Sequence, residues 1–347
     1  MNSEWKSYLE SQGANFNSHS DLVTHFDAMN IDPEQHTIIA DLSHLGVIRV
    51  EGADAMTFLQ GQTTNDISKL DSAAGHLNGY CSPKGRLLAS FYIIMRNDAY
   101  YIIIERALLP AVLKRLNMFV LMSKVELEDV SDQFVLMGIN GADAEAALAK
   151  VTSSIPETDY AVTHDGGYSF LKLPGEQRYL LFSDADNAIT LWGTLSEHAS
   201  RVGYQNWKLT DIRAAVPTIY EQTVEAFVPQ MVNMQALQGV SFKKGCYTGQ
   251  EIVARMQYLG TLKRRMYRGS VDSTDSVLPG TAIFSSSSSS GQGAGKIVDA
   301  QPSPTGGYEF LAVIEIASAE AGALTLGSED GASITLDELP YSLEQAS

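Results

Sequence analysis

Cysteine is almost absent from this 347-residue chain, which contains only Cys81 and Cys246. Two thiols cannot build the set of disulfides on which small secreted domains depend. They also cannot supply four thiolate ligands to an iron–sulfur cluster, and there is no C-x-x-C pair. We therefore expect two reduced thiols, with Cys81 structural. A cluster bridged between two chains, or transient ligation by Cys246, stays open.

Long apolar runs are also lacking. No stretch approaches the roughly 20 apolar residues needed to span a bilayer, and the longest candidate, residues 100–116, is interrupted by charged residues and Pro110. The first 13 residues show no basic segment followed by an apolar run, as a secretory signal would. These absences predict a cytoplasmic protein without a membrane partner.

Basic residues are scarce: 24 Lys and Arg stand against 41 Asp and Glu, a net charge of −17. Nucleic-acid affinity comes mainly from cations that neutralise phosphates, so we expect no extensive direct contact with nucleic acid. Residues 243–268 are the exception, because seven Lys and Arg residues accompany the single acid Glu251. Such a segment suits a small anion better than a long polyanion.

At about 150 residues per domain, the length suggests two or three folding units. Short β-branched strands first alternate with amphipathic helices, which predicts an α+β fold. Strand, Gly-Ala-Asp-Ala and helix occur in this order twice, at 52–55 and 141–144. We therefore expect two ferredoxin-like α+β subdomains, 1–130 and 131–258. In 259–347 helical periodicity disappears and short strands alternate with turns, which predicts a C-terminal β-barrel.

The most informative segment is Lys-Gly-Cys-Tyr-Thr-Gly-Gln-Glu at 244–251, preceded by Phe-Val-Pro-Gln at 227–230. Its glycines predict a loop with unusual backbone angles, and this loop is expected to enter a helix that continues through Ile252, Val253, Arg255 and Met256. Cys246 is then expected near a helix N-terminus and two lysines, and both favour the thiolate. The alternative is that Cys246 is a small buried hydrophobic residue, and the sequence leaves both open.

These motifs resemble the signature of the YgfZ family, which is related to the glycine-cleavage T-protein. The resemblance covers most of the chain and includes Gln-Gly-Gln at 60–62, Asn-Met-Gln-Ala-Leu at 233–237 and Leu-Pro-Tyr-Ser-Leu-Glu at 339–344. It implies a ring-like fold of three parts around a central channel that binds tetrahydrofolate or another reduced folate derivative. It also implies a monomer that keeps iron–sulfur enzymes active, such as tRNA methylthiotransferase.

The resemblance places the folate site at Trp207, which matches a tryptophan of the family. Leu45 stands where relatives commonly have a second tryptophan; it can still form an apolar wall but gives up stacking worth about 1 kcal/mol. Lys244, Tyr247 and Gln250 complete the expected folate contacts. The competing interpretation of Trp207 is core packing, because most tryptophans are largely buried.

The resemblance also bears on catalysis. The T-protein relatives rely on an aspartate pair shortly after a Pro-x-Gly turn, whereas here Pro-Lys-Gly at 83–85 leads to Ala89 and Ser90. Neither side chain provides a carboxylate, so we expect an accessory protein rather than an aminomethyltransferase. Two alternatives remain: a folate-dependent one-carbon transferase with an unknown donor, and a folate-free scaffold. No metal site is expected, because His44 and His76 lack partners at metal-ligand spacing. Ala215 is a further departure, since relatives often have Gly there.

Overall fold

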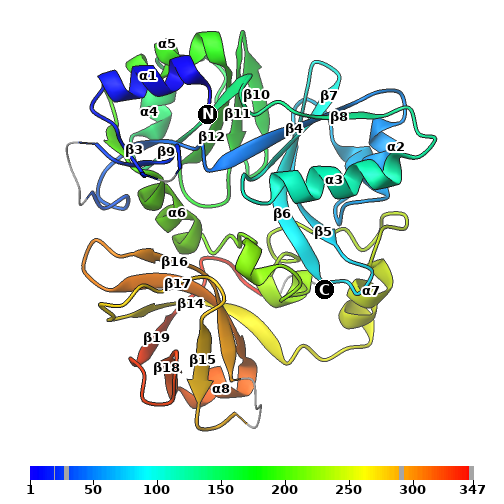
Figure 1. Ribbon diagram of the computed structural model, residues 1–347, viewed down its shortest axis with the longest axis vertical. Helices are drawn as coiled ribbons and strands as arrows, with labels where there is room; N and C mark the ends of the chain where they lie inside the picture. The colour runs from blue at the N-terminus through cyan, green and yellow to red at the C-terminus, as the bar shows by residue number, and fades with distance from the viewer. Residues whose placement is uncertain (19, 27–30, 289–292, 344–347) are drawn as a thin grey trace. The chain divides into compact units, whose positions relative to one another are not determined.

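A computed structural model of the chain describes residues 1–18, 20–26, 31–288 and 293–343 (Figure 1). Glu344, the last residue of the C-terminal motif, lies outside this range. The chain forms two compact units that interleave along the sequence. Unit 1 comprises residues 1–58, 68–76 and 92–210, and unit 2 comprises residues 59–67, 77–91 and 211–347. The sequence-based boundaries after residues 130 and 258 stay predictions.

Unit 1 contains a six-stranded sheet in which β13 runs parallel to β3 and the other neighbours are antiparallel. In spatial order the strands are β10 (Val162–Asp165), β11 (Tyr168–Lys172), β12 (Arg178–Asp184), β9 (Phe134–Asn140), β3 (Ile38–Asp41) and β13 (Ser200–Val202). The predicted strands at 37–40 and 134–139 therefore lie next to each other. Sequence alone had assigned them to different subdomains.

Both faces of this sheet are buried, and alternate residues serve alternate faces, as the pleat requires. On one face Ile39, Met137 and Leu181 join the helices α1 (Ser3–Ser11), α4 (Ala144–Leu148) and α5 (Ala185–Leu195) in one core. Trp5 of α1 and Trp192 of α5 meet edge to face there, with ring centroids 5.5 Å apart. The opposite face carries a second core, which includes Trp207.

The second sheet has five strands. Their order is β5 (Gly75–Cys81), β6 (Leu87–Arg96), β7 (Ala99–Glu105), β4 (Leu45–Glu51) and β8 (Glu126–Asp129). Asn97 and Asp98 connect β6 to β7 with φ values of 51° and 60°, the conformation favoured in two-residue hairpins. Helix α2 (Ala55–Gln60) follows β4, and α3 (Leu109–Val120) follows β7 with Pro110 in its first turn, where proline is tolerated.

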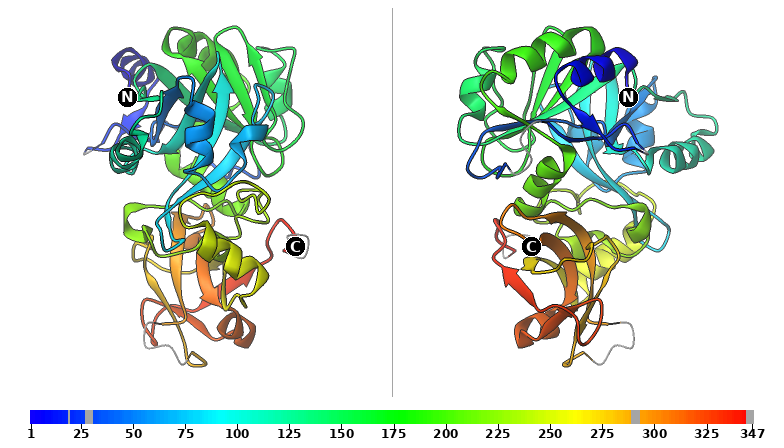
Figure 2. Two further views of the ribbon diagram at one scale, coloured as in Figure 1. Left: turned by 90° about the vertical axis from the view of Figure 1, so that its right-hand side faces the viewer. Right: turned by 60° about the vertical axis from the view of Figure 1, so that its left-hand side comes forward.

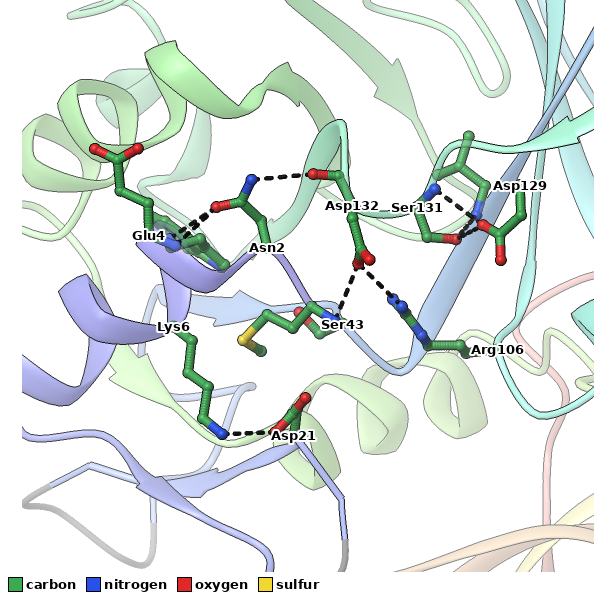
Figure 3. Close-up of polar contacts among 12 residues, drawn as sticks. Asn2, Glu4, Lys6, Asp21, Ser43, Arg106, Asp129, Ser131 and Asp132 are labelled. Atoms are coloured by element: carbon green, nitrogen blue, oxygen red, sulfur yellow. Dashed lines mark hydrogen bonds and ion pairs between the residues drawn. The ribbon is translucent and has the colours of Figure 1, made fainter.

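Side-chain contacts connect the N-terminal helix α1 to the rest of unit 1 (Figure 3). The side-chain oxygen of Asn2 accepts hydrogen bonds from the backbone N–H groups of Glu4 and Trp5 and so caps α1. The amide nitrogen of Asn2 donates to the carbonyl oxygen of Asp132 at 3.0 Å, and Arg106 forms an ion pair with the Asp132 carboxylate at 3.2 Å. The cap therefore also ties α1 to the segment between β8 and β9.

The C-terminal part of unit 2 is a six-stranded antiparallel barrel, as predicted (Figures 1 and 2). Its strands are β18 (Leu324–Leu326), β15 (Ala282–Ser285), β16 (Gly295–Pro302), β17 (Tyr308–Glu315), β14 (Arg264–Val271) and β19 (Ile334–Asp337). A bridge between Thr325 and Ser333 links the two edge strands, so the barrel is nearly closed. Phe310, Ile283 and Ile297 fill its interior. Helix α8 (Ile316–Ala321) follows β17.

The remaining elements are short. They are β1 (Asn15–Phe16), β2 (Val23–His25), η1 (Ile67–Lys69), α6 (Tyr204–Arg213), η2 (Glu221–Thr223), η3 (Pro229–Val232) and α7 (Gln250–Tyr258). The predicted α+β class with a C-terminal barrel is confirmed. No helix among the described residues is both long and apolar enough to cross a membrane.

Candidate functional site

The 244–251 motif forms a loop that leads into α7, as its glycines predicted. Gly249 precedes the helix with φ of 84°, a left-handed conformation that favours glycine. A Cβ at this position would overlap the carbonyl oxygen of Ser82 and the backbone of Gly85. Gly85 itself has φ of 67° and lies against Ile252 of α7. The motif therefore packs closely on the Pro-x-Gly turn at 83–85, and this contact requires both glycines.

Lys244 anchors the loop to a distant segment of unit 2. Its side chain is 8% exposed, and its ammonium donates to the carbonyl oxygens of Thr63 and Asn65, both at 2.6 Å. The ammonium also lies 5.1 Å from the ring centroid of Tyr247, a cation–π contact. Burial lowers the pKa of Lys244 to about 8, and the Asp66 carboxylate opposes that shift. This lysine thus holds the loop by charge-assisted hydrogen bonds.

The segment around residues 63–65 also forms hydrogen bonds with residues 238 and 239, which precede the motif in sequence. The hydroxyl of Thr64 donates to the carbonyl oxygen of Gly239 at 2.7 Å, and the amide of Asn65 donates to that of Gln238 at 2.6 Å. Sequence reasoning did not select these residues. The available signal was a run of hydrogen-bonding side chains directly after Gln-Gly-Gln at 60–62. This run does not indicate which residues its side chains bind.

Tyr247 and Gln250 complete the inner side of the loop. Tyr247 is buried, and burial together with nearby Cys81 raises the pKa of its hydroxyl. Burial raises the pKa of the Cys81 thiol to about 12, in keeping with a structural cysteine. The side-chain amide of Gln250 donates to the carbonyl oxygens of Lys244 and Gly245 at 3.4 and 3.3 Å and closes the loop.

Cys246 is exposed, unlike its neighbours Lys244 and Tyr247. The buried alternative considered from sequence therefore does not hold. A Cβ at Gly245 would meet no atom within 4 Å, so the space beside the thiol is open. Among the described residues, no group of three or more His, Cys, Asp or Glu side chains is placed to hold a metal ion. The loop thus presents a single free thiol.

Trp207 and Leu45 lie together in unit 1. Trp207, on α6, is 2% exposed and belongs to the second core of the six-stranded sheet, while half-buried Leu45, at the start of β4, packs against the same cluster. The guanidinium of Arg178 lies 5.1 Å from the centroid of the Trp207 ring. The structure thus brings these two residues together, and it separately brings together Cys246, Lys244, Tyr247 and Gln250 in unit 2. Their roles as folate contacts stay predictions.

The positions that match the T-protein aspartates serve packing and backbone hydrogen bonds. Ala89 is fully buried. The hydroxyl of Ser90 donates to the carbonyl oxygen of Pro217 at 3.1 Å and accepts from the backbone N–H of Ile219 at 3.2 Å. Ala215, two residues before Pro217, has φ of 51°, in the left-handed region. This explains why glycine suits that position.

Comparisons with known proteins agree with this architecture. The family model described as the GCVT N-terminal domain matches residues 31–207, about half of the chain. The tRNA-modifying protein YgfZ of Edwardsiella ictaluri is 33% identical over 303 residues, which cover 86% of this chain and 90% of the relative. That of Yersinia enterocolitica is 32% identical over 311 residues, covering 88% and 93%.

A solved structure shares the fold. The glycine cleavage system aminomethyltransferase T from Bartonella henselae superposes with a TM-score of 0.75 over 96% of both chains, at 14% identity. The similarity to curated relatives thus extends over nearly the whole chain, and the similarity to the aminomethyltransferase is one of fold. The chain therefore belongs to the YgfZ family, which is related to the glycine-cleavage T-protein.

Proposed function

We propose that this protein binds a reduced folate and supports iron–sulfur enzymes, and through them tRNA modification such as methylthiolation. The observation that carries the proposal is the motif loop. Lys244 and Tyr247 are held inside the protein, whereas Cys246 is exposed on a loop with a defined backbone. A thiol placed in this way is suited to meet a partner enzyme, because its position is fixed before contact.

The tRNA part of the proposal is supported by the relatives, which are named tRNA-modifying protein YgfZ. A chain of net charge −17 does not suit direct binding to a long polyanion. The protein is therefore proposed to act on the enzymes that modify the tRNA. Transient ligation of iron by Cys246 is compatible with this role, because a thiolate is the usual ligand of iron–sulfur clusters.

The folate part of the proposal is supported by the GCVT N-terminal domain and by the aminomethyltransferase fold. A pterin needs an apolar wall with a few placed polar groups. Leu45 is the accessible member of the pair that the family resemblance selects, since Trp207 is buried in the same cluster. We therefore assign the wall to Leu45 and a positioning role to Trp207.

A folate-dependent one-carbon transferase is the second candidate. Against it, Ser90 already uses its hydroxyl for Pro217 and Ile219, and Ala89 has no polar group. No carboxylate is therefore available at the matching positions to hold an amine substrate by charge. The purified protein would then transfer a one-carbon unit from a donor to tetrahydrofolate. Formation of this tetrahydrofolate adduct, lost in Cys246→Ser, would favour the transferase over the accessory role.

Calorimetric titration with 5-formyl-tetrahydrofolate tests the folate part. We expect saturable binding to the wild type and binding several-fold tighter in Leu45→Trp, because stacking of an aromatic pair adds about 0.5–1.5 kcal/mol. Leu45→Ile is the matched control and should bind like the wild type. Trp207→Phe keeps an aromatic ring in the core and should weaken binding. If the folded wild type binds no folate, the folate-free scaffold is the better description.

The partner role is tested in a strain that lacks its own member of the family. Complementation with wild-type protein should restore the methylthiolated nucleosides of bulk tRNA, measured by mass spectrometry. Cys246→Ser should restore them poorly, whereas Cys81→Ala, which keeps a small buried apolar residue, should restore them fully. Equal restoration by all three proteins would remove Cys246 from the proposal.

A further inference from the structure

A cavity of about 540 Å³ lies within unit 2. Its walls come from the turn before β6, the 226–231 segment, the start of β14 and the strands β16 and β17. The volume falls in the range of about 300–1,000 Å³ that small-molecule sites occupy. None of the residues assigned to folate or to the thiol loop lines it.

The charge of the lining is unlike that of the chain. Arg86, Arg264 and Lys296 line the cavity, and none of its lining residues within the described part of the chain is acidic. Acidic residues outnumber basic ones by 41 to 24 in the whole sequence, so a wholly basic lining is the opposite of what composition predicts. A concave wall of one sign of charge focuses the field and attracts ions of the other sign.

The two arginines are held in position by the protein. One terminal nitrogen of Arg86 donates to the carbonyl oxygens of Ala226 and Glu225 at 2.8 and 3.2 Å. A guanidinium has five N–H donors, so further donors remain for a ligand. Arg264 donates to the Glu315 carboxylate at 2.8 Å and to the carbonyl oxygen of Gly293 at 3.2 Å. The charge of Arg264 is thus partly compensated, while Arg86, among the residues that the structure describes, is paired with carbonyl dipoles alone.

Lys296 supplies the third cation. It lies on β16 with an exposed side chain, and we find no ion pair for it within the part of the chain that the structure describes. The rest of the lining includes Phe227, Met231 and Val313. An aromatic ring and two aliphatic side chains beside fixed cations form a wall that accepts an apolar body and an anionic group together.

We propose that this cavity binds a small organic anion, a carboxylate or phosphate ester with an aromatic or aliphatic body. The anionic group lies between Arg86 and Lys296, where charge-assisted hydrogen bonds are available. The body packs against Phe227, Met231 and Val313. The site does not depend on the proposed folate or iron–sulfur roles, because it uses none of their residues.

Fluorescence-monitored thermal shift and calorimetry with two probes, phenyl phosphate and phthalate, test the proposal on the full chain. We expect saturable binding of at least one probe, and the tighter of the two identifies the preferred anionic group. Lys296→Gln should weaken binding about tenfold or more, as loss of a charge-assisted hydrogen bond implies. Because Lys296 is exposed, this variant should fold normally. Lys243→Gln removes another exposed lysine of unit 2, outside the cavity, and should bind like the wild type.

Three results would overturn the site. One is the absence of saturable binding of either probe to the folded wild type. Another is equal weakening in Lys296→Gln and Lys243→Gln, which would indicate nonspecific attraction to positive charge. The third is unchanged affinity in Lys296→Gln. Benzyl alcohol, a neutral probe of similar body, should show no saturable binding, and binding as tight as that of the anions would contradict the assigned role of the cations.

Discussion

The indole of Trp207 lies directly against the Cα of Gly138, so closely that a Cβ at position 138 would overlap ring atoms Cε3 and Cζ3. Gly138 stands within β9, and α6 supplies Trp207 from the facing core. The φ of Gly138 lies outside the left-handed region, so backbone conformation does not require glycine here. The close approach of the indole to the strand backbone does.

Gly138→Ala should therefore destabilise the protein. We expect the free energy of unfolding to fall by about 1–3 kcal/mol, the usual cost of overpacking, as measured by urea denaturation. Gly193→Ala is the control, because a Cβ there would meet only the Tyr8 hydroxyl, at 3.8 Å. Position 193 is inside α5, where alanine should raise stability by about 0.5–1 kcal/mol. Equal stability of the two variants would contradict the assigned contact.

The two glycines of the motif loop should differ in the same assay. Gly249→Ala places a side chain in a left-handed backbone and against the Ser82 carbonyl oxygen, so we expect a loss of about 1–3 kcal/mol. Gly245→Ala enters open space and should change stability by less than about 0.5 kcal/mol. A tolerant Gly249 would mean that the loop does not rest on the turn at 83–85.

The turn that contains Ala215 provides a third stability test. An alanine in the left-handed region carries strain of about 1–2 kcal/mol. We expect Ala215→Gly to leave the free energy of unfolding unchanged or higher, because relief of this strain offsets the lost methyl burial. Ala214→Gly, at a position without positive φ, should lower it by about 1 kcal/mol. A loss at 215 as large as that at 214 would rule out the strain.

Lys244 should make stability depend on pH. Its pKa is about 8 in the folded protein and 10.5 for the free side chain, so the unfolded chain binds more protons between these values. The contribution of Lys244 to the free energy of unfolding is then least favourable below pH 8 and rises as pH increases from about 8 to 10.5. We expect the difference in unfolding free energy between wild type and Lys244→Met to rise over this interval.

A flat profile of this difference over the same interval would show that the Lys244 ammonium is not desolvated by the loop.

The two thiols should react very differently with a disulfide reagent such as 5,5′-dithiobis(2-nitrobenzoate). Cys246 is exposed and should react at once, whereas Cys81 is buried and burial raises the pKa of its thiol to about 12. Native protein should therefore release one equivalent of chromophore, and denatured protein two. Cys246→Ser should abolish the native reaction, and Cys81→Ala should leave it intact. Rapid native reaction of Cys246→Ser would contradict the burial of Cys81.

Local pattern predicted the fold class well. Alternation of short strands with turns identified the C-terminal barrel, and the glycines of the 244–251 motif indicated a loop that enters a helix. Strand β14 escaped prediction because Arg264, Arg265 and Arg268 made the segment conspicuous as a basic run. Only some positions of this strand are buried, so the alternation of apolar and polar residues typical of a strand is indistinct in this basic segment.

Contacts between residues distant in sequence could not be predicted from local patterns. Nothing near β3 shows that its partner is β9, about a hundred residues later. The motif predicted cationic character around Cys246, but the partners of Lys244 are backbone carbonyls at 63 and 65, which carry no side-chain signature. The burial of Trp207 likewise depends on Gly138, whose role is visible only once the strand and the helix meet.

The interleaving of the two units affects the order in which the chain can fold during synthesis. The chain passes between the units after residues 58, 67, 76, 91 and 210. Unit 1 is therefore complete on the ribosome before any residue beyond 210 is made, whereas the early segments of unit 2 must wait. The carbonyl of Thr63 meets its lysine only after 181 further residues. The anchored loop thus cannot form until Lys244 has been synthesised, after every residue of unit 1.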